Sequence, residues 1–222
     1  MAADQSRVWT CTAGGSKGRG EEVPFTAVDV ADFWRFLERS GEATTHPQRR
    51  ADWLEHRLSR VAPDHIVDFQ IHVDTARRPI DTWDMLGAAN QIMDGLCSGD
   101  SFWYFQPWLI GQGQHWWQHA AQHPDNLADL PAVQALAGRR PQDWPDSEWP
   151  HWEDLSSAAA RAYDHVTGHN DGIDDALAER GHRRPSEPEI AGTSWDTDSL
   201  AMIKRRLPRL SRMFPRHRHF HA

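Results

Sequence analysis

Cysteine is scarce in this 222-residue sequence, which has two, Cys11 and Cys97. Two cysteines are too few for the disulfide framework of a small secreted domain. Residues 1–22 contain no apolar segment of the kind that a secretory signal needs. The longest apolar stretch, Phe102–Ile110, is interrupted by Gln106 and Pro107 and is shorter than the roughly 20 residues of a membrane helix. These absences predict a cytoplasmic globular protein that does not associate with a membrane.

The sequence also lacks the short motifs that mark several enzyme classes. It has no Gly-x-Gly-x-x-Gly fingerprint, no Gly-Lys-Ser/Thr phosphate loop, no Gly-x-Ser-x-Gly elbow and no Cys-x-x-Cys pair. Paired carboxylates occur, as at Asp81 with Asp84, but nothing in the sequence indicates that such a pair is shielded from water. Whether the protein is an enzyme is therefore left open by its sequence.

Positive and negative charges are distributed unevenly along the chain. The 32 acidic residues outnumber the 24 lysines and arginines, which gives a formal net charge of −8. No acidic residue follows Asp198, whereas seven basic residues do. Because the acidic remainder repels polyanions, we expect no nucleic-acid binding. The basic C-terminal segment is predicted to dock on the acidic body of its own chain, and contact with an acidic partner is the alternative.

Apolar residues recur at helical spacing along most of the chain, without extended strand-like alternation. Helices are predicted at 30–40, 45–61, 63–73, 83–96, 102–109, 115–123, 127–136, 152–166 and 200–207, with long loops at 138–150 and 169–194. Their predicted N-caps include Asp29, Asp81, Asp100 or Ser101, and Asp196 or Asp198. The fold class is therefore predicted as all-α: a single compact multi-helix domain at 28–214 with a central helix–turn–helix and long irregular loops. Residues 1–27 are predicted to form a flexible extension, and 215–222 a basic His/Arg tail.

The central helix–turn–helix has the most distinctive sequence. It reads Trp83-Asp84-Met85-Leu86-Gly87-Ala88-Ala89, then Cys97-Ser98-Gly99-Asp100-Ser101-Phe102-Trp103-Tyr104-Phe105, and then Trp108-Leu109-Ile110-Gly111-Gln112-Gly113. With Phe33-Trp34 and Leu207-Pro208-Arg209-Leu210, this pattern resembles a bacterial, largely actinobacterial family catalogued as domain of unknown function 4240, over about residues 29–214. The resemblance implies a shared fold and a relevant central motif, but no activity. Gly99 stands where that family usually has Asp, and Gln106 where it usually has Arg.

The turn between the two central helices is the first candidate site. Backbone N–H groups at the start of the second helix could bind an anion there or lower the pKa of the Cys97 thiol. The commoner arrangement, which we favour, is an N-cap beside a buried cysteine. Trp103 and Tyr104 are adjacent and must point in different directions, so aromatic rings could line a cleft or a protein-binding surface beside this turn. The candidate cleft residues are Trp83, Asp84, Asp94, Cys97, Ser98, Asp100, Trp103, Tyr104 and Trp108.

Histidines form the second candidate site. His115, His119 and His123 recur at four-residue spacing, which places them on one helix face. Two such imidazoles can chelate one transition metal, so His115 and His119 are candidate metal ligands. A complete site would need a further ligand from elsewhere, such as Asp94, Asp100, His151 or His165. The alternative, which composition favours, is a histidine-rich surface without a metal, and no other cofactor is predicted.

Two functions follow from these candidates. The first is a non-catalytic interaction or regulatory module that recognises a protein partner through a Trp/Tyr-rich cleft beside the Cys97–Asp100 turn. The second is a small-molecule-binding protein or metal-assisted enzyme that uses His115 and His119 with Asp84 and Asp100. The absence of a known catalytic motif favours the first function. The identity of the partner or small molecule is not indicated by the sequence.

Overall fold

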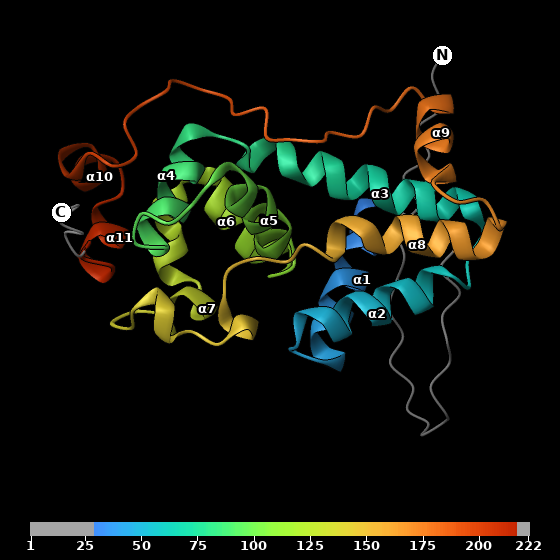
Figure 1. Ribbon diagram of the computed structural model, residues 1–222, viewed down its shortest axis with the longest axis horizontal. Coiled ribbons are helices and arrows are strands. Elements are labelled where there is room, and N and C mark those ends of the chain that lie inside the picture. Colours follow the sequence, from blue (N-terminus) through green and yellow to red (C-terminus); the bar gives the residue numbers. More distant parts are fainter. Residues whose placement is uncertain (1–28, 217–222) are drawn as a thin grey trace, which may run out of the picture.

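The structure is a computed structural model that describes residues 29–216 (Figure 1). The predicted extension at 1–27 and the last six residues of the predicted basic tail lie outside this range. Within it, regular structure is helical apart from one isolated parallel β-bridge between Thr82 and Ala191. The predicted all-α class is confirmed. None of the helices between residues 29 and 216 is both long enough and apolar enough to cross a membrane.

The α-helices of the described range are α1 Val30–Ala43, α2 Pro47–Leu58, α3 Pro63–Arg77, α4 Trp83–Ile92, α5 Gly99–Ile110, α6 Gln114–Gln122, α7 Pro131–Gln134, α8 Leu155–Thr167, α9 Gly172–Glu179, α10 Leu200–Arg206 and α11 Pro208–Met213. Short 3-10 turns lie at η1 Arg78–Ile80, η2 Pro124–Asp129, η3 Pro141–Asp143 and η4 Asp146–Glu148.

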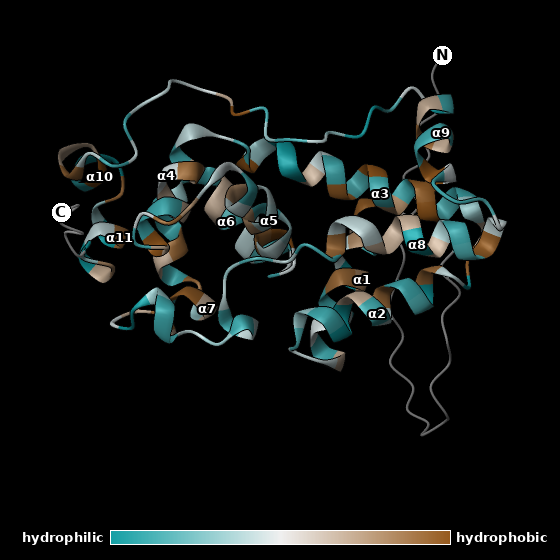
Figure 2. Ribbon diagram, viewed as in Figure 1, coloured by the Kyte–Doolittle hydropathy of each residue, from teal (hydrophilic) through white to brown (hydrophobic). Residues whose placement is uncertain are grey.

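The helices pack in two groups that share one hydrophobic core. Helices α1, α2, α3, α8 and α9 contact one another at one end of the molecule, and α4, α5, α6, α10 and α11 gather at the other with η2 (Figure 1). Helix α3 contacts α5 and so joins the groups. Hydrophobic residues lie where α1, α2, α3 and α8 face one another (Figure 2). The core continues across both groups, for example through Phe69 and Phe105, which are completely buried.

A long segment without regular structure, residues 182–199, runs across the molecule from α9 to α10 (Figure 1). We call it the connecting segment. Its Ala191 donates its N–H to the carbonyl of Asp81 and accepts from the N–H of Trp83, at 2.8 and 3.1 Å. The ring of Trp195, 7% exposed, packs against Gly87, where a Cβ atom would lie 2.2 Å from it. The absence of a side chain at Gly87 therefore lets the segment approach α4.

The predicted loop at 169–194 is wrong in part, because it contains α9. Most residues of 169–194 are polar, which favours a loop. Ile173 and Leu177, however, lie four positions apart and are both buried. This pair is enough to hold a short helix against α3 and α8. Gly168 adopts the left-handed conformation at the C-cap of α8 and so ends that helix.

Three predicted N-caps are replaced by neighbouring hydroxyl residues. Thr82 caps α4, Ser98 caps α5 and Ser199 caps α10. Asp81, predicted to cap the fourth helix, instead accepts hydrogen bonds from the side chain of Gln106 and the N–H of Glu189. Because the Asp81 carboxylate makes these tertiary contacts, the hydroxyl of the next residue, Thr82, forms the N-cap of α4. The N-cap predicted at Asp29 is confirmed by its bond to the N–H of Asp32.

The basic C-terminal segment docks on acidic residues of the same chain, as predicted, within the described range. Arg206 pairs with Asp84 at 2.7 Å. Arg209 binds Asp129 through both terminal nitrogens. Arg216 pairs with Asp198 at 2.6 Å. These contacts fix α10 and α11 beside α4 and η2.

Candidate functional site

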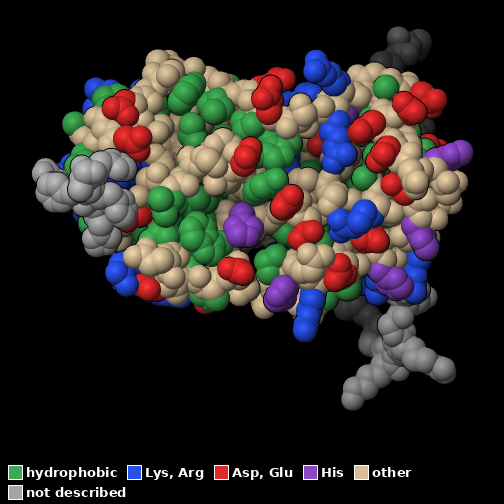
Figure 3. Space-filling view, in the orientation of Figure 1, with side chains coloured by type: hydrophobic (Ala, Val, Ile, Leu, Met, Phe, Trp, Pro, Cys, Tyr) green, Lys and Arg blue, Asp and Glu red, His purple; other side chains and the backbone are tan. Residues whose placement is uncertain are grey.

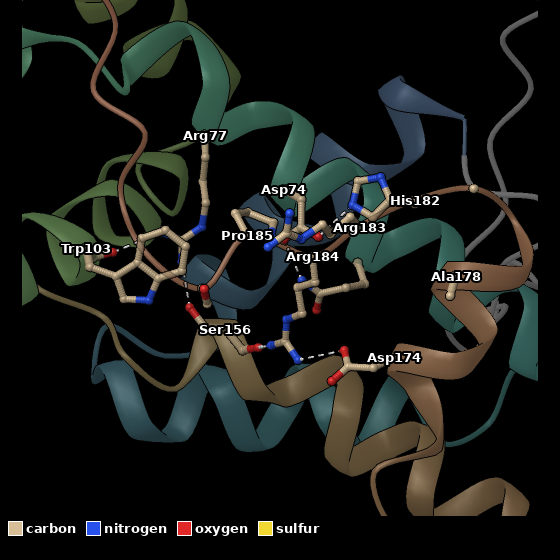
Figure 4. Close-up of a pocket in the computed structure, with 13 residues that line it drawn as sticks. Asp74, Arg77, Trp103, Ser156, Asp174, Ala178, His182, Arg183, Arg184 and Pro185 are labelled. Atoms are coloured by element: carbon tan, nitrogen blue, oxygen red, sulfur yellow. Dashed lines mark hydrogen bonds and ion pairs between the residues drawn. The ribbon is translucent and has the colours of Figure 1, made fainter.

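A pocket of about 680 Å³ lies between α3, α5, α8, α9 and the start of the connecting segment (Figure 4). We call it the α3–α9 pocket. Asp74 and Arg77 of α3, Trp103 of α5 and Ser156 of α8 line it, together with residues of α9 and 181–186. A second hollow, of about 430 Å³, continues from it and shares Asp74, Arg77 and Trp103. The face shown in Figure 3 carries both acidic and basic side chains over the half of the molecule that contains α8 and α9.

Polar side chains form one side of this pocket. Gln70, Asp74 and Arg77 follow one another at i, i+4 and i+7, so they share a face of α3. They are only 1%, 4% and 3% exposed. Burying such groups is costly unless each finds a hydrogen-bond partner. The arrangement of their partners therefore explains much of the local architecture.

The carboxylate of Asp74 is held on both oxygens. Its Oδ1 accepts a hydrogen bond from the side-chain amide of Gln70 at 2.8 Å. Its Oδ2 lies 2.8 Å from Nε2 of His182, the first residue of the connecting segment. Burial raises the pKa of Asp74 above its ordinary value, and the bonds to His182 and Gln70 oppose that rise. The pair joins α3 to the segment that closes the pocket.

The guanidinium of Arg77 links three helices. Its Nη1 donates to the carbonyl of Trp103 and to Oε1 of Gln106, both at 3.0 Å. Its Nη2 donates to Oγ of Ser156 at 2.7 Å. The carbon at the centre of the guanidinium lies 3.8 Å from the centroid of the Trp103 ring. Burial lowers the pKa of Arg77 to about 10, so the group stays charged at neutral pH and holds the indole by a cation–π contact.

Gln106, which stands where the resembling family usually has Arg, extends this network. It is fully buried, and its side-chain amide donates to Oδ1 of Asp81 at 3.0 Å while its carbonyl accepts from Arg77. A neutral amide thus bridges a buried cation and a carboxylate. Gly99, the other departure, opens α5 with nothing within 4 Å of the place where a Cβ would lie.

Two arginines lie at the rim of the pocket. Arg184 donates to the carbonyl of Ser156, and its Nη1 lies 3.7 Å from Oδ1 of Asp174. Arg183 is exposed and forms no hydrogen bond or ion pair with any residue from 29 to 216. Another lining atom, Oε1 of Gln70, is buried and has no hydrogen-bond partner within the same range. The pocket therefore offers an unpaired cation and an unpaired acceptor.

In the Cys97–Asp100 turn, which was predicted as a site, the hydrogen bonds cap α5 and tie the turn to α4. The hydroxyl of Ser98 accepts from the N–H of Ser101 at 3.1 Å and so caps α5, whereas Asp100 is exposed. The N–H of Cys97 donates to the side chain of Asn90. Burial raises the pKa of the Cys97 thiol to about 12, which agrees with the favoured prediction of an N-cap beside a buried cysteine and not with the alternative of a lowered pKa. The interaction role that was predicted for a cleft beside this turn stays a prediction.

The other predicted cleft residues are dispersed. Of the nine, all within the described range, only Trp103 lines the α3–α9 pocket. Tyr104 points to Glu153, 3.2 Å from its hydroxyl, and Trp108 lines a different pocket. Trp83 and Asp84 begin α4, where Asp84 is paired with Arg206. Asp94 follows α4 in a left-handed conformation, with φ of 53°.

The candidate metal ligands do not converge on a third group. The rings of His115 and His119 stack with their centroids 6.2 Å apart. Nε2 of His119 lies 3.1 Å from Asp129, whose carboxylate is also bound by Arg209. Asp100 stands at the start of α5, whereas His115 and His119 follow the end of that helix. The twelve residues of α5 span about 18 Å. Between residues 29 and 216, no group of three or more His, Cys, Asp or Glu side chains could hold a metal ion.

Gln70, Asp74, Arg77 and His182 are not among the site residues that the sequence predicts. One signal for the first three is present in the sequence. They interrupt the apolar pattern of α3 at helical spacing and form a polar face beside its apolar residues. No comparable signal marks His182, because its contact with Asp74 spans 108 residues of chain.

In a comparison with known protein families, a family model aligns with residues 28–165. The matched region contains Asp74, Arg77, Trp103 and Ser156, whereas His182 and Arg184 lie beyond it. No curated protein and no solved structure matches the chain. Because the family model covers more than half of the sequence, the chain belongs to the family described as protein of unknown function (DUF4240).

Proposed function

We propose that the protein binds a small molecule with a flat ring and a negatively charged group in the α3–α9 pocket. The observation that carries this proposal is the pairing of an indole ring, Trp103, with two rim arginines around one pocket of about 680 Å³. Ligand pockets of proteins typically enclose about 300–1,000 Å³ and combine aromatic walls with a few polar groups. The α3–α9 pocket has this size and composition.

Trp103 supplies the wall for a flat ring. Its side chain is half-buried and lines both the pocket and the hollow that continues from it. The guanidinium of Arg77, 3.8 Å from the ring centroid, is itself fixed by three hydrogen bonds. The indole is therefore held in place before a ligand arrives, which reduces the entropy lost on binding. Stacking on such a ring stabilises a bound aromatic group by about 0.5–1.5 kcal/mol beyond simple burial.

Arg183 and Arg184 supply the positive charge. Arg183 has no partner in the described part of the chain. Arg184 has Asp174 as its nearest carboxylate at 3.7 Å, and the Asp174 side chain is 63% exposed. An exposed ion pair of this kind contributes little to stability, so a ligand anion can replace it. The planar guanidinium fork suits a carboxylate or a phosphate.

Calorimetric titration of the full-length protein tests this proposal. The probe is adenosine monophosphate, which has a flat base and a phosphate, and adenosine is its uncharged comparison. We expect the nucleotide to bind at least about tenfold more tightly than the nucleoside, a difference of about 1.4 kcal/mol. Ala178→Phe places a ring at an exposed position that lines the pocket, and should weaken nucleotide binding at least about tenfold.

The matched control is Ala135→Phe, which adds the same ring at an exposed position that lines another pocket. Nucleotide affinity should be unchanged in this variant. Equal affinities for nucleotide and nucleoside would remove the role assigned to the arginines. The proposal would fail if none of the four monophosphates, those of adenosine, uridine, guanosine and cytidine, bound to the protein. It would also fail if Ala178→Phe left their binding intact.

A further inference from the structure

A second pocket, of about 320 Å³, shares no lining residue with the α3–α9 pocket. It lies among α2, the end of α5, α7 and the residues that precede α8. Trp108, Leu136 and Trp152 give it apolar walls, and Arg50 of α2 gives it a positive charge. We call it the Arg50 pocket.

Arg50 is fixed by neutral groups. Its Nε donates to Oγ of Ser40 at 3.2 Å, and its Nη2 donates to the carbonyls of Leu37 and Gly111 at 3.3 and 2.8 Å. The guanidinium carbon lies 4.4 Å from the centroid of the Trp152 ring. Its Nη1 makes no hydrogen bond to any residue that the structure describes. One donor group of a fixed guanidinium is therefore left free.

No carboxylate of residues 29–216 forms an ion pair with Arg50. Glu148 lines the same pocket but pairs with Arg139. Glu38 lines an adjoining hollow and accepts from the N–H of Gln114 at 3.2 Å. Burial lowers the pKa of Arg50 to about 10, and no neighbouring charge opposes this effect. The guanidinium is still protonated at neutral pH, so the pocket contains a partly buried positive charge without compensation, an unfavourable arrangement.

Trp152 adds a second unpaired donor. It is 2% exposed, and its indole N–H is buried without a hydrogen-bond partner among residues 29–216. Buried donors without an acceptor are rare in folded proteins, because each has lost its hydrogen bonds to water without gaining a partner. Both unpaired donors belong to residues that line this pocket.

We infer that the Arg50 pocket binds an organic carboxylate with an apolar body. The carboxylate accepts from Nη1 of Arg50 and neutralises its charge, as guanidinium groups do with carboxylates elsewhere. The apolar body packs against Trp108, which is still 8% exposed, and leaves water to lie beside the other apolar groups that line the pocket. A volume of about 320 Å³ suits a compact molecule with one ring.

The test uses 3-phenylpropionate and, as its uncharged comparison, 3-phenylpropionamide, each titrated into the full-length protein. We expect the acid to bind at least about tenfold more tightly than the amide. Ala135→Phe fills the pocket without altering the groups that hold Arg50, and should weaken binding of the acid at least about tenfold. Ala178→Phe, in the α3–α9 pocket, should leave it unchanged.

Ala135→Phe is the decisive variant because Arg50 also ties α2 to α1 and to the end of α5. Arg50→Gln adds a second test if its circular dichroism and melting temperature match those of the wild type, and should abolish the preference for the acid. Equal binding of acid and amide, no binding of the acid, or undiminished binding in Ala135→Phe would each overturn the inference. Ala135→Phe and Ala178→Phe separate this result from that of nucleotide binding, because each adds a ring to only one of the two pockets.

Discussion

Nε2 of His182 lies 2.8 Å from Oδ2 of Asp74, across 108 residues of chain. Asp74 belongs to the region that the family model matches, and His182 begins the connecting segment beyond it. The Asp74 side chain is 4% exposed and that of His182 is 11% exposed. A nearly buried polar contact therefore holds the segment that forms one wall of the α3–α9 pocket.

His182→Ala should release this wall. The change leaves a buried carboxylate oxygen of Asp74 without its partner, which costs about 1–3 kcal/mol of folding free energy. Urea denaturation measures that loss. Hydrogen exchange should also accelerate at residues 182–186. The matched control is His165→Ala, at an exposed position of α8, and should change the free energy of unfolding by less than about 0.5 kcal/mol. Equal effects of the two variants would contradict the anchoring role of His182.

Gly87→Ala should disturb the connecting segment at a second point. The new Cβ would lie 2.2 Å from Cζ2 of Trp195, so the ring must move from the surface of α4. Overpacking of this kind costs about 1–3 kcal/mol. Gly99→Ala is the control, because nothing lies within 4 Å of its Cβ position, and it should be neutral or stabilise the fold by up to about 1 kcal/mol. Melting temperatures of the two variants test this contrast, and an unchanged melting temperature for Gly87→Ala would refute the close packing.

Most helices could be predicted from the sequence because their apolar residues recur at helical spacing. The prediction was less accurate where tertiary contacts compete with local ones. Asp81 and Asp198 both stand beside a hydroxyl residue at a helix start, and their carboxylates are engaged by Gln106 and Arg216. The hydroxyl of Thr82 or Ser199 then caps the helix. A single sequence does not show which aspartates are engaged elsewhere.

The candidate site was less predictable than the fold. Trp103 could be identified as a cleft residue because aromatic rings on adjacent helix positions cannot all face the core. Its neighbours in the pocket come from α3, α8, α9 and the connecting segment, and only packing brings these elements together. The histidine spacing predicts a shared helix face, which the stacked rings of His115 and His119 confirm, whereas the prediction is wrong for His123, which lies beyond the end of α6 in an extended conformation. Spacing within one helix does not specify a ligand from another.

Cys97 should react slowly with alkylating reagents. Burial raises the pKa of its thiol to about 12, so very little thiolate exists at neutral pH. In a Cys11→Ser variant, which leaves Cys97 as the remaining cysteine, we expect iodoacetamide to react at least about tenfold more slowly than with an unstructured cysteine peptide. Mass spectrometry measures the rate, and urea should restore it. Rapid modification of the folded variant at neutral pH would show that the turn activates the thiol.

Asp129→Asn should reduce the sensitivity of the protein to acid. The hydrogen bonds from Arg209, and next that from His119, hold the pKa of Asp129 below its ordinary value. A carboxylate whose pKa is lowered by folding stabilises the native state above its unfolded pKa of about 3.9, and this contribution is lost as pH falls toward the folded pKa. The wild type should therefore melt at a higher temperature than Asp129→Asn at pH 7, and the difference should shrink below about pH 4.

Melting temperatures measured from neutral pH down to about pH 2.5 follow this change. Arg209→Gln removes the larger cause of the lowered pKa and should flatten the acid dependence in the same way. The backbone N–H of Arg209 still donates to Asp125 in that variant, so α11 keeps its contact with η2. A melting-temperature difference between wild type and Asp129→Asn that stays constant across this range would show that the Asp129 carboxylate gains nothing from Arg209 and His119. In that case α11 would be held by Asp125, by the hydrogen bond from Gln91 to the carbonyl of Phe214 and by apolar packing.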